Sequence, residues 1–166
     1  VHALSAGSEQ SSSKNGKITF IPCEAVVDPM RLLSHKYLKN MIDFEQSDII
    51  LAGGLGAGKE GFRLLNAIAN YLNCPVAATK LAVNAGLAPY SAQVGQTGAS
   101  VRPKVYIACG ISGALQHLAG MSSSEYIISV NTDRFAPIFN IADMGYVGDC
   151  IVFLKTLWNK LQCNNR

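Results

Sequence analysis

The sequence contains a series of short runs that are apolar almost throughout, and this feature constrains the fold more than any other. The runs are DIILAGG (residues 48–54), CPVAAT (74–79), PKVYIACG (103–110), YIISVN (126–131) and IFNIAD (138–143), with a further candidate, KITFIP (17–22), near the start. A strand with one face in water alternates polar and apolar residues, whereas a strand covered on both faces is apolar throughout. We therefore expect a parallel sheet with helices on both faces.

Helical patterns separate these runs. They are KEGFRLLNAIANYL (residues 59–72), SGALQHLAGM (112–121) and LKTLWNKLQ (154–162), and residues 30–42 have a less regular pattern of the same period. In the first of them the apolar residues recur at the spacing that places them on one face of a helix. The alternation of strands and helices predicts an α/β fold with a doubly wound, mainly parallel sheet.

The composition is that of one well-buried domain. Apolar residues make up 49% of the 166 residues and charged residues 15%, which is typical of a globular chain with its own core. Residues 1–16 are polar and rich in serine, so we interpret them as a linker or as the stump of an N-terminal domain. Residues 17–166 form the expected domain.

Several classes of function fit the sequence poorly. The net charge is +3 without a cluster of Lys and Arg, which argues against nucleic acid as a partner. No apolar run approaches the roughly 20 residues that cross a bilayer, so we expect no membrane insertion. The five cysteines are odd in number and include no C-x-x-C pair; we expect reduced thiols in an intracellular protein and no metal site.

Glycine or polar residues follow the predicted strands where each one ends. They are Gly53 and Gly54, Thr79 and Lys80, residues 110–112, residues 131–133, and Asp143. In open parallel sheets ligands bind beyond the carboxyl ends of the strands. We therefore expect these loops to form the binding site.

The first of these loops matches two phosphate-binding patterns at once. Residues 53–59 read G-x-x-x-x-G-K and residues 56–61 read G-x-G-x-x-G. A P-loop needs Ser or Thr after the lysine as a magnesium ligand, but Glu60 stands there and would repel phosphate. The second pattern begins several residues after its strand. We interpret the loop as a strand-to-helix turn, with Lys59 and Glu60 on the first turn of the helix.

Two later segments are more specific. QVGQTG (residues 93–98) combines glycines, amides and a hydroxyl, and glycines allow backbone N–H groups to turn toward an anion. CGISGALQHLAG (109–120) is a strand end, a glycine turn and a helix. The positive end of such a helix is a suitable seat for a diphosphate. His117 lies near the start of that helix.

In this order and spacing, the segments QVGQTG, YIACGISGALQHLAGM, SVNTD and APIFNIADMGYVGD resemble the FAD-binding domain of the electron transfer flavoprotein alpha subunit. The resemblance covers residues 48–149. It implies a Rossmann-like variant of the doubly wound fold, with FAD as the cofactor, and an electron carrier that performs no side-chain catalysis of its own.

The same resemblance implies partners and a location. The alpha subunit would pair with a beta subunit, receive electrons from flavin dehydrogenases and pass them to a downstream acceptor. Family members carry a further domain before this one. The protein would work in the bacterial cytoplasm or the mitochondrial matrix.

The resemblance also assigns residues to the flavin end of the cofactor. Thr97 would lie near the reactive nitrogen of the flavin ring, and residues 93–96 would line that ring. Thr79 and Lys80 match a Ser-Arg pair beside it. His117 would donate a hydrogen bond at the pyrimidine edge, where negative charge gathers on one-electron reduction.

The other assignments concern the diphosphate and the adenosine. Residues 112–116 would hold the diphosphate, and Asn131 and Asp143 would reach the adenosine. The full set of expected cofactor contacts is Gly54, Thr79, Lys80, Gln93, Val94, Gly95, Gln96, Thr97, Ser112, Gly113, Ala114, Leu115, Gln116, His117, Asn131, Asp143 and Met144.

Two departures from the family pattern keep alternatives open. The family's first loop reads Gly-Gly-Arg-Gly, and we expect Gly54 to stand in place of the arginine; Lys80 replaces the second arginine by a point charge. We expect either weaker FAD binding or a shifted redox potential. An alternative is that the chain is a non-redox member that acts as a binding or assembly module. An NAD-binding enzyme would need a better-placed glycine fingerprint and a set of catalytic residues, and we find neither in the sequence.

Overall fold

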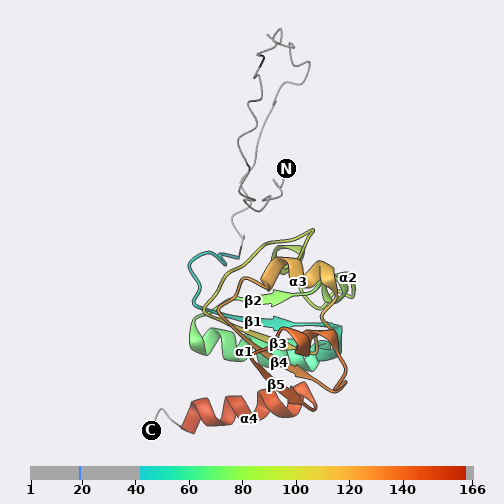
Figure 1. The fold of residues 1–166 in the computed structure, drawn as a ribbon. Coiled ribbons are helices and arrows are strands. Elements are labelled where there is room, and N and C mark those ends of the chain that lie inside the picture. Colours follow the sequence, from blue (N-terminus) through green and yellow to red (C-terminus); the bar gives the residue numbers. More distant parts are fainter. Residues whose placement is uncertain (1–18, 20–41, 164–166) are drawn as a thin grey trace. The chain divides into compact units, whose positions relative to one another are not determined.

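A computed structural model describes Thr19 and residues 42–163 of the chain. Within these residues a five-stranded, all-parallel sheet has the order β2-β1-β3-β4-β5 (Figure 1). The strands are β1 (Ile49–Gly53), β2 (Val76–Ala78), β3 (Val105–Cys109), β4 (Tyr126–Asn131) and β5 (Met144–Val147). The helices are α1 (Gly58–Leu72), α2 (Lys80–Asn84), α3 (Leu115–Met121) and α4 (Cys150–Cys163), with short 3-10 helices at Leu55–Ala57, Tyr90–Ala92 and Pro137–Asn140.

The α/β fold with its parallel sheet is confirmed. The strand expected at 17–22 and the helix expected at 30–42 lie outside the described residues, apart from Thr19 and Ile42. The same holds for the interpretation of residues 1–16. No helix in the described part of the chain is long and apolar enough to cross a bilayer.

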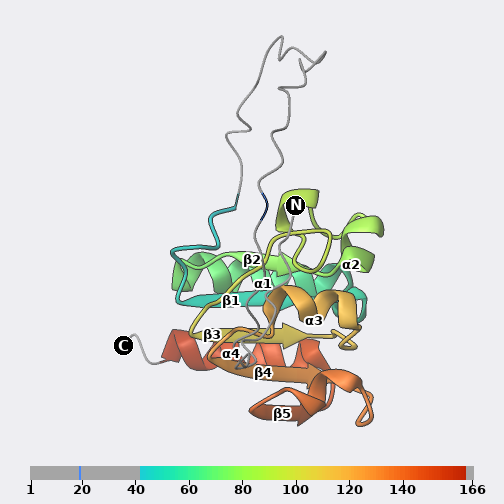
Figure 2. The ribbon, with the colours of Figure 1, turned by 45° about the horizontal axis from the view of Figure 1, so that its top comes forward.

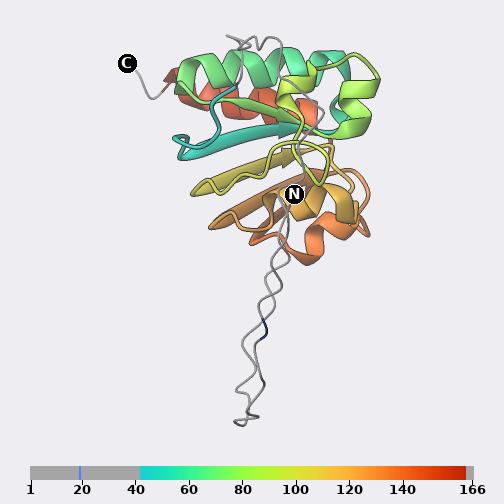
Figure 3. The same cartoon turned by 90° about the horizontal axis from the view of Figure 1, so that it is seen from above.

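The helices form layers on both faces of the sheet. Figure 3 shows α1 and α4 together on one side and α3 on the other. On the first side the fully buried Leu65 and Ile68 of α1 pack in one core with Leu154 of α4. On the second side Met121 of α3 packs in a separate core with Tyr106 of β3. Burial on both faces explains why β1 and β3 are apolar throughout.

The order 2-1-3-4-5 determines where a ligand can bind. β1 lies between β2 and β3. After β2 the chain therefore crosses back over β1 to form β3 on its other side, and the sheet has its switch point between β1 and β3. In doubly wound sheets the crevice opens at this switch point, beyond the carboxyl ends of the strands. Figures 1 and 2 show α2 and α3 at the ends to which the strand arrows point.

The strand predicted at residues 138–143 is wrong. Pro137–Asn140 form a 3-10 helix with proline in its first turn, a position that suits the fixed φ of proline. Ile138 is apolar because it packs in the core beside α3, where its exposed fraction is 0%. The true strand, β5, follows at Met144–Val147 on the sheet edge, and all its residues are exposed.

This shift moves Asp143 to the other edge of the sheet. Asp143 precedes β5 and lies at the amino ends of the strands, where its backbone N–H donates to the Ile127 carbonyl at 2.9 Å. The Asp143 carboxylate in turn accepts from the Ile127 N–H at 2.8 Å. Asp143 and Met144 therefore fix the start of β5 against β4 and do not lie on the ligand side.

The helix α2 was not expected. It has five residues, too few for a periodic apolar pattern. Thr79 caps it, because the Thr79 hydroxyl oxygen accepts a hydrogen bond from the Ala82 N–H at 3.3 Å. Such capping satisfies one of the free N–H groups of the first turn.

Ser129 of β4 generates a prediction about stability. Its side chain is 0% exposed, and its hydroxyl has no hydrogen-bond partner within the described part of the chain. An unpaired buried hydroxyl costs about 1–3 kcal/mol. We expect Ser129→Ala to leave the free energy of unfolding unchanged or to raise it by up to that amount, as measured by urea denaturation.

Ala52 of β1 offers the matched control. It is 0% exposed and lies in the same row of the sheet, two strands away from Ser129, so Ala52→Ser buries a hydroxyl out of reach of Ser129 and should destabilise the fold. A clear loss of stability in Ser129→Ala would mean that the hydroxyl has a partner.

Candidate functional site

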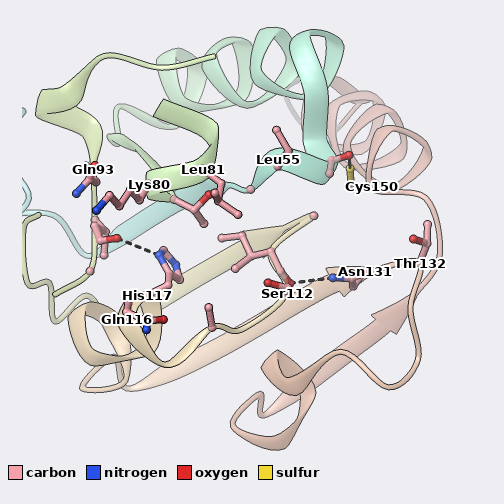
Figure 4. A pocket seen from close by; sticks show the side chains of 18 of the residues that line it. Leu55, Lys80, Leu81, Gln93, Ser112, Gln116, His117, Asn131, Thr132 and Cys150 are labelled. Carbon is pink, nitrogen blue, oxygen red and sulfur yellow. Dashed lines mark hydrogen bonds between the residues drawn. The ribbon is translucent and has the colours of Figure 1, made fainter. Parts of the chain in front are cut away.

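A pocket of about 740 Å³ runs along the carboxyl edge of the sheet (Figure 4). The loops after all five strands contribute to it. The lining residues are Gly54, Leu55 and Gly56 after β1; Thr79, Lys80 and Leu81 after β2, with residues 93–97 beyond them; Gly110, Ile111, Ser112, Ala114, Gln116 and His117 after β3; Asn131 and Thr132 at the end of β4; and Gly148, Asp149, Cys150 and Ile151 after β5. The expected ligand edge is therefore also where this pocket lies.

The pocket brings together most of the residues expected from the sequence. These are Gly54, Thr79, Lys80, Gln93, Val94, Gly95, Gln96, Thr97, Ser112, Ala114, Gln116, His117 and Asn131. Gly113 does not line it, because it packs against the backbone of Ile138. Leu115 is 79% exposed and is also outside the lining. Asp143 and Met144 lie at the opposite edge.

Sequence reasoning missed the part of the pocket that follows β5. Gly148 and Asp149 stand just beyond the end of this strand. The Asp149 carboxylate accepts hydrogen bonds from the N–H groups of Ile151 (2.6 Å) and Val152 (3.3 Å) and so caps α4. The rule that polar residues follow strand ends would have found Asp149 if β5 had been placed at residues 144–147.

The first loop behaves as a strand-to-helix turn, as predicted. Lys59 and Glu60 lie in the first turn of α1. Glu60 is directed to α4, where its carboxylate lies 2.8 Å from the Lys155 ammonium. This ion pair holds the pKa of Glu60 below its usual value. Neither residue lines the pocket.

Gly54 cannot stand in place of an arginine. A Cβ atom on Gly54 would overlap the carbonyl oxygen of Gly110, and relieving this overlap would require the backbone to move. Leu55, the next residue, is 53% exposed and lines the pocket. In the order Gly-Gly-Arg-Gly the third position is Leu55, so the expectation for Gly54 is corrected: the missing arginine corresponds to Leu55.

Thr97 is held by two hydrogen bonds. The side-chain amide of Gln93 donates to the Thr97 Oγ1 at 3.0 Å, and the Tyr90 hydroxyl donates to the Thr97 carbonyl at 3.1 Å. Gln93 is buried, with an exposed fraction of 4%. Because Oγ1 accepts from Gln93, the hydroxyl proton of Thr97 remains available to a ligand.

His117 is buried in the pocket wall and both of its ring nitrogens have protein partners. Nδ1 lies 3.0 Å from the Val94 carbonyl oxygen, and Nε2 lies 3.1 Å from the Tyr106 hydroxyl. Burial lowers the pKa of His117, and the Val94 carbonyl opposes this only in part. The expected free donor on His117 is thus engaged within the protein.

Asn131 positions the turn that follows β3. Its side-chain amide donates to the Ile111 carbonyl at 2.8 Å (Figure 4), and its Oδ1 accepts from the Asp133 N–H at 2.9 Å. The turn begins at Gly110, whose φ of +62° favours glycine. It leads to α3, whose N-terminus has no side-chain cap among the described residues.

The donor set fits a diphosphate. The start of α3 offers backbone N–H groups, Ser112 offers a hydroxyl, and Lys80 supplies a positive charge on the facing wall (Figure 4). The lining contains one carboxylate, that of Asp149, which the N-terminus of α4 already engages. Lys80 lies at the β2 end of the pocket with residues 93–97, and Asp149 lies at the β4–β5 end with Asn131 and Thr132.

Comparison with known proteins agrees with this geometry. Residues 43–122 match the family described as the electron transfer flavoprotein FAD-binding domain. The electron transfer flavoprotein subunit alpha of Thermoanaerobacterium thermosaccharolyticum is 47% identical over 128 residues, which cover 76% of this chain and 39% of that protein. The subunit alpha of Bacillus subtilis is 44% identical over 146 residues, covering 86% of this chain and 44% of that protein.

A mitochondrial relative shows the same degree of similarity. The mitochondrial electron transfer flavoprotein subunit alpha of Oryza sativa subsp. indica is 46% identical over 120 residues, covering 72% of this chain and 34% of that protein. The chain spans about two fifths of the length of these curated relatives. Its described domain belongs to the family of FAD-binding domains found in electron transfer flavoprotein alpha subunits.

Proposed function

We propose that the pocket binds FAD and that the domain works in an electron carrier of the alpha-subunit type. One observation supports this more than any other: a single pocket is lined by the loops after all five strands. Neighbouring strands lie about 4.8 Å apart, so the edge from β2 to β5 runs about 19 Å. This length suits an extended dinucleotide better than a mononucleotide.

The order of the strands suggests which end of the pocket holds each half of the cofactor. Residues 93–97 and Lys80 lie beside β2 and would contact the flavin ring. Thr97 would donate its free hydroxyl proton there. Asn131, Thr132 and Asp149 lie at the β4–β5 end, where a ribose hydroxyl and an adenine could find acceptors.

The diphosphate would lie between these ends, over the start of α3. Ser112 and Gln116 are exposed in the pocket and can donate to phosphate oxygens. The uncapped N–H groups of α3 add the positive end of a short helix. Lys80, from the flavin end of the pocket, would balance part of the negative charge.

Bound FAD would supply one-electron transfer, and the residues of this chain would bind it, orient it and set its electrostatic surroundings. The apolar side chains of Leu55 and Leu81 line the pocket opposite Ser112 (Figure 4). They would exclude water from part of the cofactor. This role needs no side chain that acts as a nucleophile or as a general base.

The wider role rests on the relatives. Proteins named electron transfer flavoprotein subunit alpha occur in bacteria and, as a mitochondrial protein, in rice. By analogy, the protein would pair with a beta subunit, accept electrons from flavin dehydrogenases and pass them to a downstream acceptor. It would work in the bacterial cytoplasm or the mitochondrial matrix.

The central test is a titration of the 166-residue chain with FAD, followed by flavin fluorescence. We expect saturable binding at one FAD per chain with a Kd of tens of micromolar or lower. Because the pocket spans both halves of the dinucleotide, FAD should bind at least about tenfold more tightly than FMN or AMP, a difference of about 1.4 kcal/mol. No saturable signal would favour the alternative of a non-redox binding or assembly module.

Leu55 provides a test of the corrected position of the missing arginine. We expect Leu55→Arg to tighten FAD binding by about 1–2 kcal/mol, the scale of one partly exposed charge-assisted hydrogen bond. The matched control is Tyr126→Arg, which adds the same charge at the amino end of β4, where the side chain is 48% exposed. Equal gains in the two variants, or no gain in Leu55→Arg, would show that Leu55 does not face the cofactor.

A further inference from the structure

His117 is the middle member of a chain of hydrogen bonds that joins three separate elements. Val94 belongs to the segment after α2, Tyr106 to β3, and His117 to α3. The distances are 3.0 Å from the Val94 carbonyl oxygen to Nδ1 and 3.1 Å from the Tyr106 hydroxyl to Nε2. All three residues are buried, with exposed fractions of 1%, 0% and 6% in the order of their numbers.

The chemistry of the three groups fixes the direction of both hydrogen bonds. A carbonyl oxygen only accepts, so Nδ1 must carry a proton and donate to Val94. In the neutral ring Nε2 is then an acceptor, and the Tyr106 hydroxyl donates to it. Burial raises the pKa of Tyr106 well above its usual value, which keeps this hydroxyl protonated as a donor.

The hydroxyl of Tyr106 makes its one hydrogen bond, within the described residues, to His117. If His117 took up a second proton, Nε2 would become a donor and the proton of Tyr106 would lose its acceptor. A buried donor without a partner is unfavourable. The arrangement therefore stabilises the neutral ring in addition to the effect of burial.

We propose that Tyr106 is a positioning residue that, together with the Val94 carbonyl, fixes His117 as a neutral ring with its proton on Nδ1 and its plane held against the pocket wall. The proposal rests on the proposed function, because the wall that His117 forms is the one assigned to FAD. The charged side chains that line the same pocket are Lys80 and Asp149. The cation beside the cofactor is then Lys80, and His117 acts as an oriented neutral dipole.

A positioning role for Tyr106 differs from a packing role, because Tyr106 would then affect FAD binding only by way of His117. A residue that only fills space would act on FAD binding equally whether or not His117 is present. A positioning residue loses its effect when its target is removed. A double-mutant cycle with Tyr106→Phe and His117→Gln separates the two cases.

The first experiment is a nitrogen-15 NMR measurement of the histidine rings in the 166-residue chain without FAD. His117→Gln assigns the signals, since the chain has three histidines. We expect Nδ1 in the range of a protonated nitrogen and Nε2 in that of a hydrogen-bonded acceptor. Tyr106→Phe should move the Nε2 signal toward that of a free acceptor, and the control Tyr126→Phe should not. A proton on Nε2 in the parent chain would overturn the proposal.

The second experiment measures FAD affinity in the same variants. We expect Tyr106→Phe to weaken binding about threefold to tenfold, the scale of one hydrogen bond, and to have less than about a twofold effect in the His117→Gln background. Equal losses in both backgrounds would contradict the positioning role. A chain that binds no FAD would overturn the proposed function, whereas the NMR signals and their change in Tyr106→Phe would still decide whether Tyr106 fixes the His117 ring.

Discussion

The pocket depends on the close approach of two backbone segments, the loops after β1 and β3. The Gly54 N–H donates to the Cys109 carbonyl at 2.9 Å, and the Gly56 N–H donates to the Gly110 carbonyl at 3.2 Å. At this separation a Cβ atom on Gly54 would overlap the Gly110 carbonyl oxygen. Glycine at these positions therefore lets the central strands share one continuous floor, and side chains enter the pocket from residues on either side.

The polar interior of the domain is concentrated beside this floor. Gln93, His117 and Ser129 are buried polar side chains of the described residues, and the hydroxyl of Tyr106 is buried with them. Gln93 and His117 both line the pocket and both bond to neighbours that fix their orientation. Burying such groups is favourable only when their hydrogen bonds are made. The same bonds that stabilise the core thus orient the pocket wall.

The central strands and α1 were predictable from sequence because burial on both faces leaves a continuous apolar run. The sheet edge was not, because β5 is exposed on all its residues and the apolar residues before it belong to a 3-10 helix. A single misplaced strand put Asp143, and not Asp149, among the polar residues expected at the carboxyl edge of the sheet. An apolar run in the sequence marks the two ends of a strand clearly only when helices cover both faces of that strand.

One feature of the site followed from residue order, and another did not. The order Gly-Gly-Leu-Gly at residues 53–56 already places Leu55 where the family pattern has arginine, and the close approach of Gly54 to the Gly110 carbonyl oxygen agrees with it. Tyr106 lies in the middle of an apolar run, where nothing in the sequence marks it as a partner of a residue eleven positions later. Contacts between elements, such as those of His117, come from the packing of α3 on the sheet.

Amide hydrogen exchange with and without FAD reports on every loop of the domain at once. If FAD binds in the pocket, it should slow exchange in residues 54–57, 93–97, 110–117 and 148–151 at the carboxyl edge and leave the amino edge around Asp143 unchanged. Protection confined to the amino edge, or no change at the carboxyl edge under saturating FAD, would contradict binding in this pocket.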